Sequence, residues 1–308
     1  MKECISLGKR IYCHRDTSDF GLQRLLVFIV RAKIHKKQVN ELLDFFSENP
    51  TLVDIEENNP IIFEQLTRHV FYHQSTLDER LAFIKQHFIC SSTYFRQECL
   101  NDIYNDGALL LWEEAYGDDK LCINLNFKYV DRKEGLMSIE LTLGKERIYH
   151  ITFWLDQSED KERTLWIGAL QGILGGANII HDLTKHFFAY RPKNLILYAL
   201  RTVACTLGIS KIYAVSNEGF FTNTHVRLDK KLKTLLDEFW QETGGSLCED
   251  HRFFELPVIE VRKSIEEVKS QKRNLYRKRY AALDEIEKGI KYNLNSYLKV
   301  KNNVTLVR

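Results

Sequence analysis

The stretch from Thr164 to Asn217 constrains the fold more than any other part of this sequence. A short apolar run at 164–170 is followed by two helical runs, at 177–188 and 191–208, and then by a second apolar run at 212–216. Short apolar runs bounded by glycine are typical of buried strands. A strand, a helical crossover and another strand predict two parallel strands in one sheet.

This crossover unit also predicts where a ligand would bind. Ligands of such units lie beyond the carboxyl ends of the strands. The residues at those ends are Gln171, Gly172, Ser216 and Asn217. We therefore expect a ligand-binding edge at these four residues.

Three glycines, Gly172, Gly175 and Gly176, come immediately before the first helix of the crossover. Exposed backbone amides at the start of a helix can hold a phosphate. A tight turn from strand to helix needs glycine as well, so both explanations stay open. The sequence has no lysine-bearing phosphate-loop motif, which argues against ATP hydrolysis.

The second crossover helix carries the other candidate ligand residues. Pro192 in its first turn and Gly208 at its end are the residues that favour these two positions. The candidates are Arg191, Lys193, Tyr198 and Arg201. The helix is largely apolar, and a buried guanidinium is costly unless it is paired. We therefore expect Arg201 to meet a carboxylate or an anionic ligand.

The regions on either side of this unit have different periodicities. Residues 1–105 are typical of helices, and Thr76 with Glu79 forms a capping box. Residues 106–171 alternate between polar and apolar and turn repeatedly, which predicts an antiparallel meander with one packed and one polar face. The expected fold is α+β, with a helical region at 1–105, a sheet domain at 106–260 and a basic helix at 261–308 packed on or beside it.

The last region concentrates positive charge on a chain whose net charge is only +2. Residues 262–279 contain eight Lys or Arg and two acids. The predicted contact surface comprises Lys272, Arg273, Tyr276, Arg277, Lys278 and Arg279. Its partner would be inner-leaflet lipid, RNA or an acidic protein. The alternatives are a solvated face and an internal dock on acidic residues such as Glu113 and Glu114. A capping box at Ser264 and Glu267 is expected to open this helix, which would run to about Tyr297.

Cysteines and histidines give no sign of a metal or hydrolase site. The seven cysteines are scattered without CxxC spacing, as in a protein with reduced thiols. His181, His186 and His225 lack a fixed acid or cysteine partner in the sequence. The longest apolar run near the start, residues 25–30, is too short for a signal peptide or a membrane span. We expect a cytoplasmic protein, or one peripheral to the inner membrane.

Several ordered motifs resemble the VirK/YbjX family of Gram-negative bacteria. They are Gly-Ala-Leu-Gln-Gly at 168–172, Arg-Pro-Lys-Asn-Leu at 191–195, Ala-Leu-Arg at 199–201, Leu-Gly-Ile at 207–209, Ala-Val-Ser-Asn at 214–217, Phe-Trp-Gln-Glu-Thr-Gly-Gly at 239–245, Phe-Phe-Glu-Leu-Pro at 253–257 and Lys-Arg-Asn-Leu-Tyr-Arg-Lys-Arg-Tyr at 272–280. The family has no known reaction. The resemblance implies a factor that supports virulence, envelope integrity or resistance to antimicrobial peptides.

The order of predicted elements also resembles the GNAT acyltransferases. In that family the helix after a splayed strand binds the pyrophosphate of coenzyme A through an Arg/Gln-x-x-Gly-x-Gly/Ala loop. Gly172, Gly175 and Ala177 match the spacing, but the first position is glycine, and an additional helix follows. The alternative function is therefore an acyl- or aminoacyl-transferase that uses coenzyme A or another acyl carrier at residues 164–217. A gap between the two parallel strands, with a cavity lined by Arg201, would favour the enzyme, and a filled gap would favour the non-catalytic factor.

Overall fold

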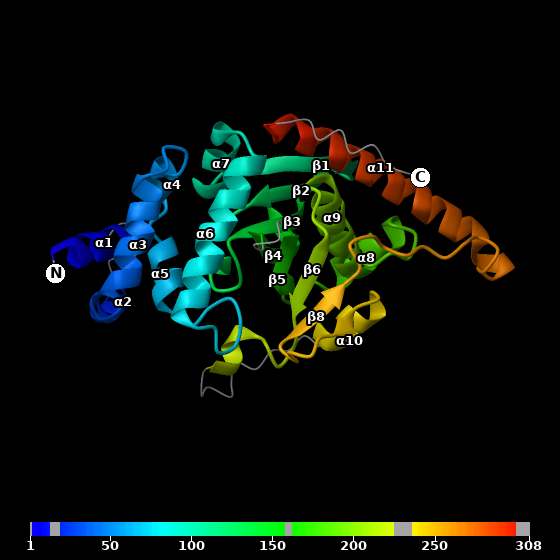
Figure 1. The fold of residues 1–308 in the computed structure, drawn as a ribbon. Helices are drawn as coiled ribbons and strands as arrows, with labels where there is room; N and C mark the ends of the chain where they lie inside the picture. The colour runs from blue at the N-terminus through cyan, green and yellow to red at the C-terminus, as the bar shows by residue number, and fades with distance from the viewer. Residues whose placement is uncertain (1, 13–18, 158–161, 225–235, 300–308) are drawn as a thin grey trace.

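In the computed structural model, the chain forms an α+β fold in which helices flank one open sheet (Figure 1). The structure describes residues 2–12, 19–157, 162–224 and 236–299. Within these ranges the sheet has eight strands in the order β1-β2-β3-β4-β5-β6-β8-β7. The predicted α+β class and mostly antiparallel sheet are confirmed.

Seven helices precede the sheet in the described part of the chain. They are α1 (Lys2–Tyr12), α2 (Asp19–Ile34), α3 (Lys36–Ser47), α4 (Val53–Asn58), α5 (Ile62–Thr67), α6 (Leu77–Tyr94) and α7 (Gln97–Tyr104). The capping box predicted for Thr76 and Glu79 is present: the Thr76 hydroxyl accepts from the Glu79 amide at 3.2 Å, and the Thr76 amide donates to the Glu79 carboxylate at 2.7 Å.

The sheet begins with a meander and ends with the crossover. Its elements are β1 (Leu109–Tyr116), β2 (Asp119–Asn126), β3 (Met137–Leu143), β4 (Glu146–Gln157), β5 (Arg163–Gly172), α8 (Ala177–His186), α9 (Pro192–Thr206), β6 (Lys211–Val215), α10 (Leu236–Glu242), β7 (Ser246–Leu247), β8 (Phe253–Leu256) and α11 (Arg273–Tyr297). The β5 and β6 strands pair in parallel, as the crossover predicts, and the other pairs are antiparallel.

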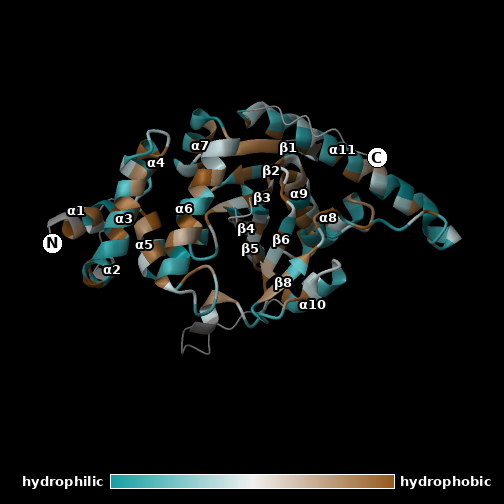
Figure 2. Cartoon of the chain, viewed as in Figure 1, coloured by the Kyte–Doolittle hydropathy of each residue, from teal (hydrophilic) through white to brown (hydrophobic). Residues whose placement is uncertain are grey.

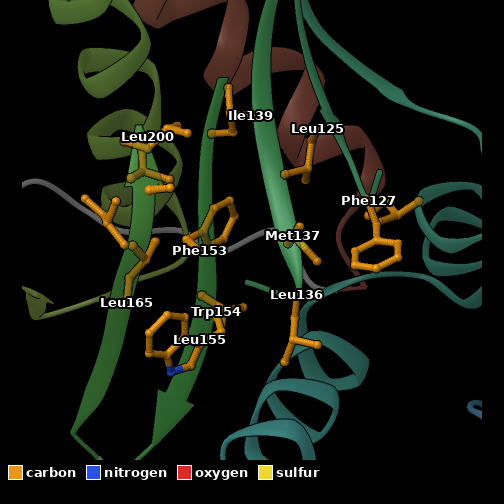
Figure 3. Close-up of a cluster of buried hydrophobic side chains, with 14 of the residues drawn as sticks. Leu125, Phe127, Leu136, Met137, Ile139, Phe153, Trp154, Leu155, Leu165 and Leu200 are labelled. Atoms are coloured by element: carbon orange, nitrogen blue, oxygen red, sulfur yellow. The ribbon is translucent and has the colours of Figure 1, made fainter. Parts of the chain in front are cut away.

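The two faces of the sheet pack against different helices. On one face, Trp154 of β4 lies against Phe83 of α6, with ring centroids 5.6 Å apart. The neighbouring residue Phe153 points to the other face, because successive side chains of a strand alternate. Leu200 of α9 joins the hydrophobic cluster of that second face (Figure 3). Hydrophobic residues colour much of β1, and hydrophobic and hydrophilic residues alternate along helices such as α6 (Figure 2).

The last helix, α11, packs against α9 and β1 through its second half. Asn293 and Tyr297 donate hydrogen bonds to carbonyl oxygens of β1, at 2.9 and 3.0 Å. Its first turns extend beyond the neighbouring helices (Figure 1). The predicted end at Tyr297 is correct, but the helix begins at Arg273 rather than after Ser264. The Ser264 and Glu267 bonds exist and close a separate turn, because a short 3-10 turn at Ser270–Lys272 intervenes.

The buried side chains of the helical region and of the sheet form one hydrophobic cluster that runs from α1 to α11. The division at residues 105 and 260 stays a prediction. Across the described ranges, no helix combines the length and the hydropathy needed to cross a membrane.

Candidate functional site

Four strands carry a row of polar side chains on the face of the sheet opposite α9. Directly paired positions of β2, β3, β4 and β5 hold Asn124, Glu140, His150 and Gln171, which we call the polar row. Paired residues project from the same face of a sheet, so these four side chains are neighbours. Glu140 and His150 are each only 6% exposed. Buried polar groups in a hydrophobic sheet indicate a structural network or a functional site.

The segment between β2 and β3, residues 127–136, lies against the polar row, and we call it the cover segment. It is held from the other side by α5. Gln65 donates hydrogen bonds to the carbonyl oxygens of Arg132 and Gly135, at 2.7 and 2.9 Å. The Arg132 Nε atom also lies 2.8 Å from Glu64 Oε2, in an ion pair between two buried side chains. The helical region therefore holds the cover segment on the sheet.

A bulge in β5 determines where Glu134 of the cover segment lies. Thr152 pairs with Ala169 and Phe153 pairs with Ile167, which leaves Gly168 as the extra residue. A Cβ atom at position 168 would lie 1.7 Å from the Glu134 carbonyl oxygen. Only glycine permits so close an approach. The bulge thus brings Glu134 beside the second half of β5.

The Glu134 carboxyl group is buried and incompletely bonded. Its Oε1 atom accepts a hydrogen bond from Gln171 Nε2 at 2.5 Å, while its Oε2 atom has no hydrogen-bond partner among the described residues. Burial, together with the negative charge of Asp131, raises the pKa of Glu134 to about 8. The group therefore changes its protonation state near neutral pH.

Asp131, in the same segment, has the opposite character. Its carboxylate oxygens lie 2.5 and 3.2 Å from the two terminal nitrogens of Arg147, and His150 Nε2 lies 3.3 Å from Oδ1. Burial opposes ionisation, but the contacts with His150 and Arg147 outweigh it, and the pKa of Asp131 is lowered. Two adjacent carboxyl groups whose pKa values diverge are an arrangement that supports acid–base chemistry.

The three predicted glycines lie where β5 ends and α8 begins. Gly172 packs against the ring of Tyr149, and a Cβ at position 172 would lie 2.7 Å from that ring. Gly175 has a φ of +74° and no heavy atom within 4 Å of the place where its Cβ would be. Gly176 precedes α8 as its N-cap, and the first turn of α8 contains no acidic residue. The start of α8 is thus a turn without a side-chain cap.

Arg191 and Lys193 lie at the start of α9. The Arg191 guanidinium donates to Asn194 Oδ1 at 3.0 Å and lies 2.5 Å from Glu242 Oε2. Burial raises the pKa of Tyr149, and the charge of Arg191 opposes that shift. The Lys193 ammonium is 4.6 Å from the ring centre of Phe239.

Tyr198 and Arg201 lie further along α9. The Tyr198 hydroxyl donates to Glu287 and accepts from Arg262 at 2.7 Å. Arg201 is 3% exposed and donates to the Thr243 carbonyl oxygen at 2.9 Å. Burial lowers the pKa of Arg201, and the nearby charge of Glu260 opposes the shift. The Arg201 guanidinium thus donates its hydrogen bond to a backbone carbonyl oxygen. Glu260 supplies the negative charge near it.

Ser216 and Asn217 bond to neighbouring loops and to α10. The Ser216 hydroxyl donates to the His251 carbonyl oxygen at 2.7 Å and accepts from the Gly219 amide at 3.0 Å. Asn217 Oδ1 accepts a hydrogen bond from the Leu236 backbone amide at 2.9 Å. The Asn217 backbone amide donates to Asp237 Oδ1 at 2.7 Å. Asn217 therefore helps to fasten α10 at the end of β6, while Ser216 joins the two neighbouring loops.

Trp240 of α10 covers part of the same edge. The parallel pairing of β5 with β6 ends at Ile167 and Ala214, whereas β5 runs on to Gly172. The next carbonyl oxygen of β6, that of Val215, accepts from the Trp240 indole at 3.0 Å. Trp240 is fully buried, so a side chain occupies this part of the space where the two strands separate.

The ten predicted ligand residues therefore divide among four places. Gln171 joins the polar row and Glu134. Gly172, Gly175, Gly176, Arg191 and Lys193 surround the end of β5 and the starts of the two crossover helices. Tyr198 and Arg201 lie on the other side of the sheet from Gln171, beside the segments before α11 and after α10. At the end of β6, Ser216 bonds to neighbouring loops and Asn217 bonds to the start of α10.

The predicted basic surface is divided as well. Arg279 donates to the carbonyl oxygens of Phe188 and Ala189, at 3.0 and 3.1 Å. Arg273 donates to two carbonyl oxygens of the turn before α11, at 3.1 and 3.2 Å. Lys272, Arg277 and Lys278 are exposed, and Tyr276 is partly buried beneath Arg279. The acids proposed as an internal dock pair elsewhere: Glu113 lies 3.1 Å from Lys120, and Glu114 lies 2.6 Å from His186.

His181 and His225 are the other two histidines singled out from the sequence. His181 is exposed and lies 3.5 Å from Asp182, and His225 lies outside the described residues. Within the described ranges, no group of three or more His, Cys, Asp or Glu side chains is arranged to hold a metal ion.

The sequence interpretation missed Asp131, Glu134, Arg147 and His150. The alternation within residues 106–171 predicted a polar face for the meander but not what would cover it. The signal that could have found the site is the continuation of that polar face into β3 and β4, at Glu140 and His150. The loop acids could not be assigned to it, because their position depends on contacts with α5.

Comparisons with known proteins agree with the resemblance of the motifs. Residues 20–292 match the family model described as "Protein of unknown function (DUF535)". The chain is 29% identical over 267 residues to the "Uncharacterized protein YbjX" of Escherichia coli (strain K12), covering 84% of this chain and 80% of that protein. It is 25% identical over 301 residues to an uncharacterized protein of Haemophilus influenzae (strain ATCC 51907 / DSM 11121 / KW20 / Rd), covering 93% and 94% of the two chains. The chain belongs to the DUF535 family, which includes YbjX.

Proposed function

We propose that this chain is an acyltransferase that takes an acyl group from a coenzyme A thioester at the second half of β5. The observation that carries the proposal is that β5 runs on past its parallel pairing with β6, beside a space that Trp240 fills in part. The two strands pair in parallel only from Thr164 to Ile167, and β5 continues through a bulge to Gly172. The strand order β4-β5-β6-β8-β7 around this separation supports the likeness to GNAT acyltransferases. Fold likeness alone does not establish a reaction, so the site must carry the argument.

The end of β5 supports binding of a phosphate. Gly175 leaves space for a close backbone approach, and the amides at the start of α8 have no side-chain cap. Arg191, at the start of α9, carries a positive charge that Glu242 partners. Backbone amides at a helix start together with a guanidinium suit an anionic pyrophosphate. These residues therefore fit the phosphate end of an acyl carrier.

Glu134 supports the chemical step. When bound, the thioester would supply an activated acyl group. The Glu134 carboxylate would accept the proton from an attacking amine or hydroxyl group and, as the acyl C–S bond breaks, would return it to the departing thiolate; Gln171 would hold the carboxylate in place. A pKa of about 8 suits this role, because such a group can accept and return a proton near neutral pH. Asp131, held ionised by Arg147, would keep the pKa of Glu134 high.

The second candidate is a non-catalytic factor that supports envelope integrity and peptide resistance, as the family resemblance implies. Two observations favour it. Trp240 covers the β6 carbonyl where the strands separate, and Arg201 is bonded to Thr243 rather than exposed to a cavity. A packed edge of this kind fits a binding protein better than a cofactor cleft.

Calorimetry with acetyl-coenzyme A and with longer acyl-coenzyme A thioesters separates the two candidates. We expect binding to the native chain and its loss in Gly175→Val, because a β-branched side chain would block the backbone approach. Gly117→Val is the matched control, since Gly117 also has a positive φ and open space at its Cβ but lies in the β1–β2 turn. The transferase proposal fails if neither thioester binds the native chain, or if both variants bind equally well.

A further inference from the structure

Helix α2 is hydrophobic on both sides. Its inner side packs into the protein through Leu25, Phe28 and Ala32, which are between 0% and 8% exposed. Its outer side carries a second set of aliphatic side chains that are between 42% and 70% exposed, namely Leu22, Leu26, Val27, Val30 and Ile34. A surface helix normally turns polar residues outward, so this outer side needs a reason.

The exposed aliphatic residues are contiguous. Leu22, Leu26 and Val30 follow one another at intervals of four residues, which aligns them along one side of the helix. Val27 and Ile34 widen this stripe. Of the seven exposed positions between 21 and 34, only Gln23 and Lys33 are polar. We call the five aliphatic residues the outer stripe.

The charge around the outer stripe has one sign. From Gly21 to Gln38 the sequence contains no acidic residue and five basic ones: Arg24, Arg31, Lys33, Lys36 and Lys37. Of these, Lys33, Lys36 and Lys37 are exposed. Figure 1 shows α2 at the end of the molecule away from the first turns of α11, so this positive region is separate from the one on α11.

We propose that α2 docks on an anionic lipid surface, with the outer stripe among the acyl chains and the neighbouring cations against the lipid phosphates. Amphipathic helices that lie in the membrane interface combine these two features. The 16 residues of α2 span about 24 Å, less than the hydrocarbon core of a bilayer, so the helix would lie along the surface. A protein partner fits less well, because protein interfaces favour aromatic residues and disfavour lysine.

Vesicle sedimentation of the full chain tests this proposal, which does not depend on the transferase. The chain should sediment with vesicles of equal parts phosphatidylglycerol and phosphatidylcholine and stay in solution with phosphatidylcholine alone. High salt should weaken the binding. Leu26→Glu with Val30→Glu should reduce the bound fraction by roughly tenfold or more, because both side chains would leave hydrocarbon.

Two comparisons make the result decisive. Val261→Glu is the control, because Val261 is an 87% exposed aliphatic residue far along the chain from α2, and this variant should bind as the native chain does. Sedimentation equilibrium of the native chain and of the double variant shows whether the outer stripe pairs with a second copy instead. The proposal would be overturned if the native chain did not bind the vesicles, or if the double variant bound them as well as the native chain does. It would also be overturned if the native chain were a dimer and the double variant a monomer.

Discussion

Glu134 and Arg201 are both charged side chains buried beside the same sheet, but they lie on opposite faces and are held differently. Arg201 is carried by the long helix α9, and its guanidinium bonds to the backbone of the segment after α10. Glu134 is carried by a loop, and one of its carboxyl oxygens has no partner in the described part of the chain. The Arg201 Nε atom also lacks a hydrogen-bond partner among the described residues. Arg201 nevertheless joins α9 to the segment after α10, whereas the Glu134 carboxyl group, bonded through Oε1 to Gln171, fits the proton transfer proposed above.

The strongest test of this contrast removes the support of the cover segment. Arg132→Met should destabilise the fold by about 3–5 kcal/mol, because it leaves the buried Glu64 without one of its two cationic partners. Urea denaturation measures the loss. Lys85→Met is the control, since Lys85 pairs with Glu41 near the surface and should cost only about 0–1 kcal/mol. Equal losses in the two variants would mean that the cover segment is not held by this ion pair.

A second prediction concerns the pH dependence of stability. The raised pKa of Glu134 means that the folded state binds a proton between pH 4.5 and about 8 that the unfolded state has released. The stabilisation of the folded state by this bound proton is fully present below the pKa of the unfolded state and is lost as pH rises through the pKa of the folded state. Above about pH 8, the free energy of unfolding of Glu134→Gln should therefore exceed that of the native chain by roughly 2–4 kcal/mol. Denaturation of both proteins across the pH range measures this difference.

Asp131→Asn is the counterpart with the opposite sign. The pKa of Asp131 is lowered, so its stabilising contribution is present above its unfolded pKa and disappears as pH falls through the folded pKa. The variant should be less stable than the native chain at neutral pH and should approach it in acid. A Glu134→Gln protein whose stability follows the native curve at every pH would contradict the assignment of a buried, protonated Glu134.

Arg201→Met should lower the free energy of unfolding by a smaller amount, about 1–3 kcal/mol, because it leaves the Thr243 carbonyl oxygen without its hydrogen-bond donor. Thermal unfolding measures the change. If Arg201 only joins elements, the variant should keep the native binding of acyl-coenzyme A thioesters and the native pH dependence of stability. Loss of thioester binding in a folded variant would instead assign Arg201 to the ligand site.

The smallest effects are expected in α11. Arg279→Met should cost about 1 kcal/mol, because two carbonyl oxygens at the end of α8 lose a charged donor. Lys278→Met should change stability by less than about 0.5 kcal/mol, since Lys278 is exposed. Chemical denaturation of the two variants compares them directly. A larger loss for Lys278→Met would show that the exposed cations also hold the helix in place.

The elements with local signals could be predicted from the sequence. The crossover, the Thr76 capping box and the end of α11 follow from apolar periodicity and capping residues. The Ser264 box was assigned to the wrong element, because the same two bonds can close an isolated turn. Within the predicted meander, β2 ends at Asn126, where the chain turns away as the cover segment to meet α5.

The candidate site was only partly predictable. Gln171 could be found because it ends a strand of the crossover. Glu134 could not, because its pKa and position depend on the bulge at Gly168 and on burial beneath α5. These are contacts between residues far apart in the sequence, and no local pattern reports them.

The protonation state of Glu134 tests the account most directly. Carbon-13 NMR of glutamate-labelled protein can follow each side-chain carboxyl through a pH titration, and the signal absent from Glu134→Gln identifies the residue. We predict that this carboxyl titrates with an apparent pKa of about 8 and that the value falls in Asp131→Asn. A Glu134 carboxyl that stays ionised down to its ordinary range near pH 4.5 would contradict the account.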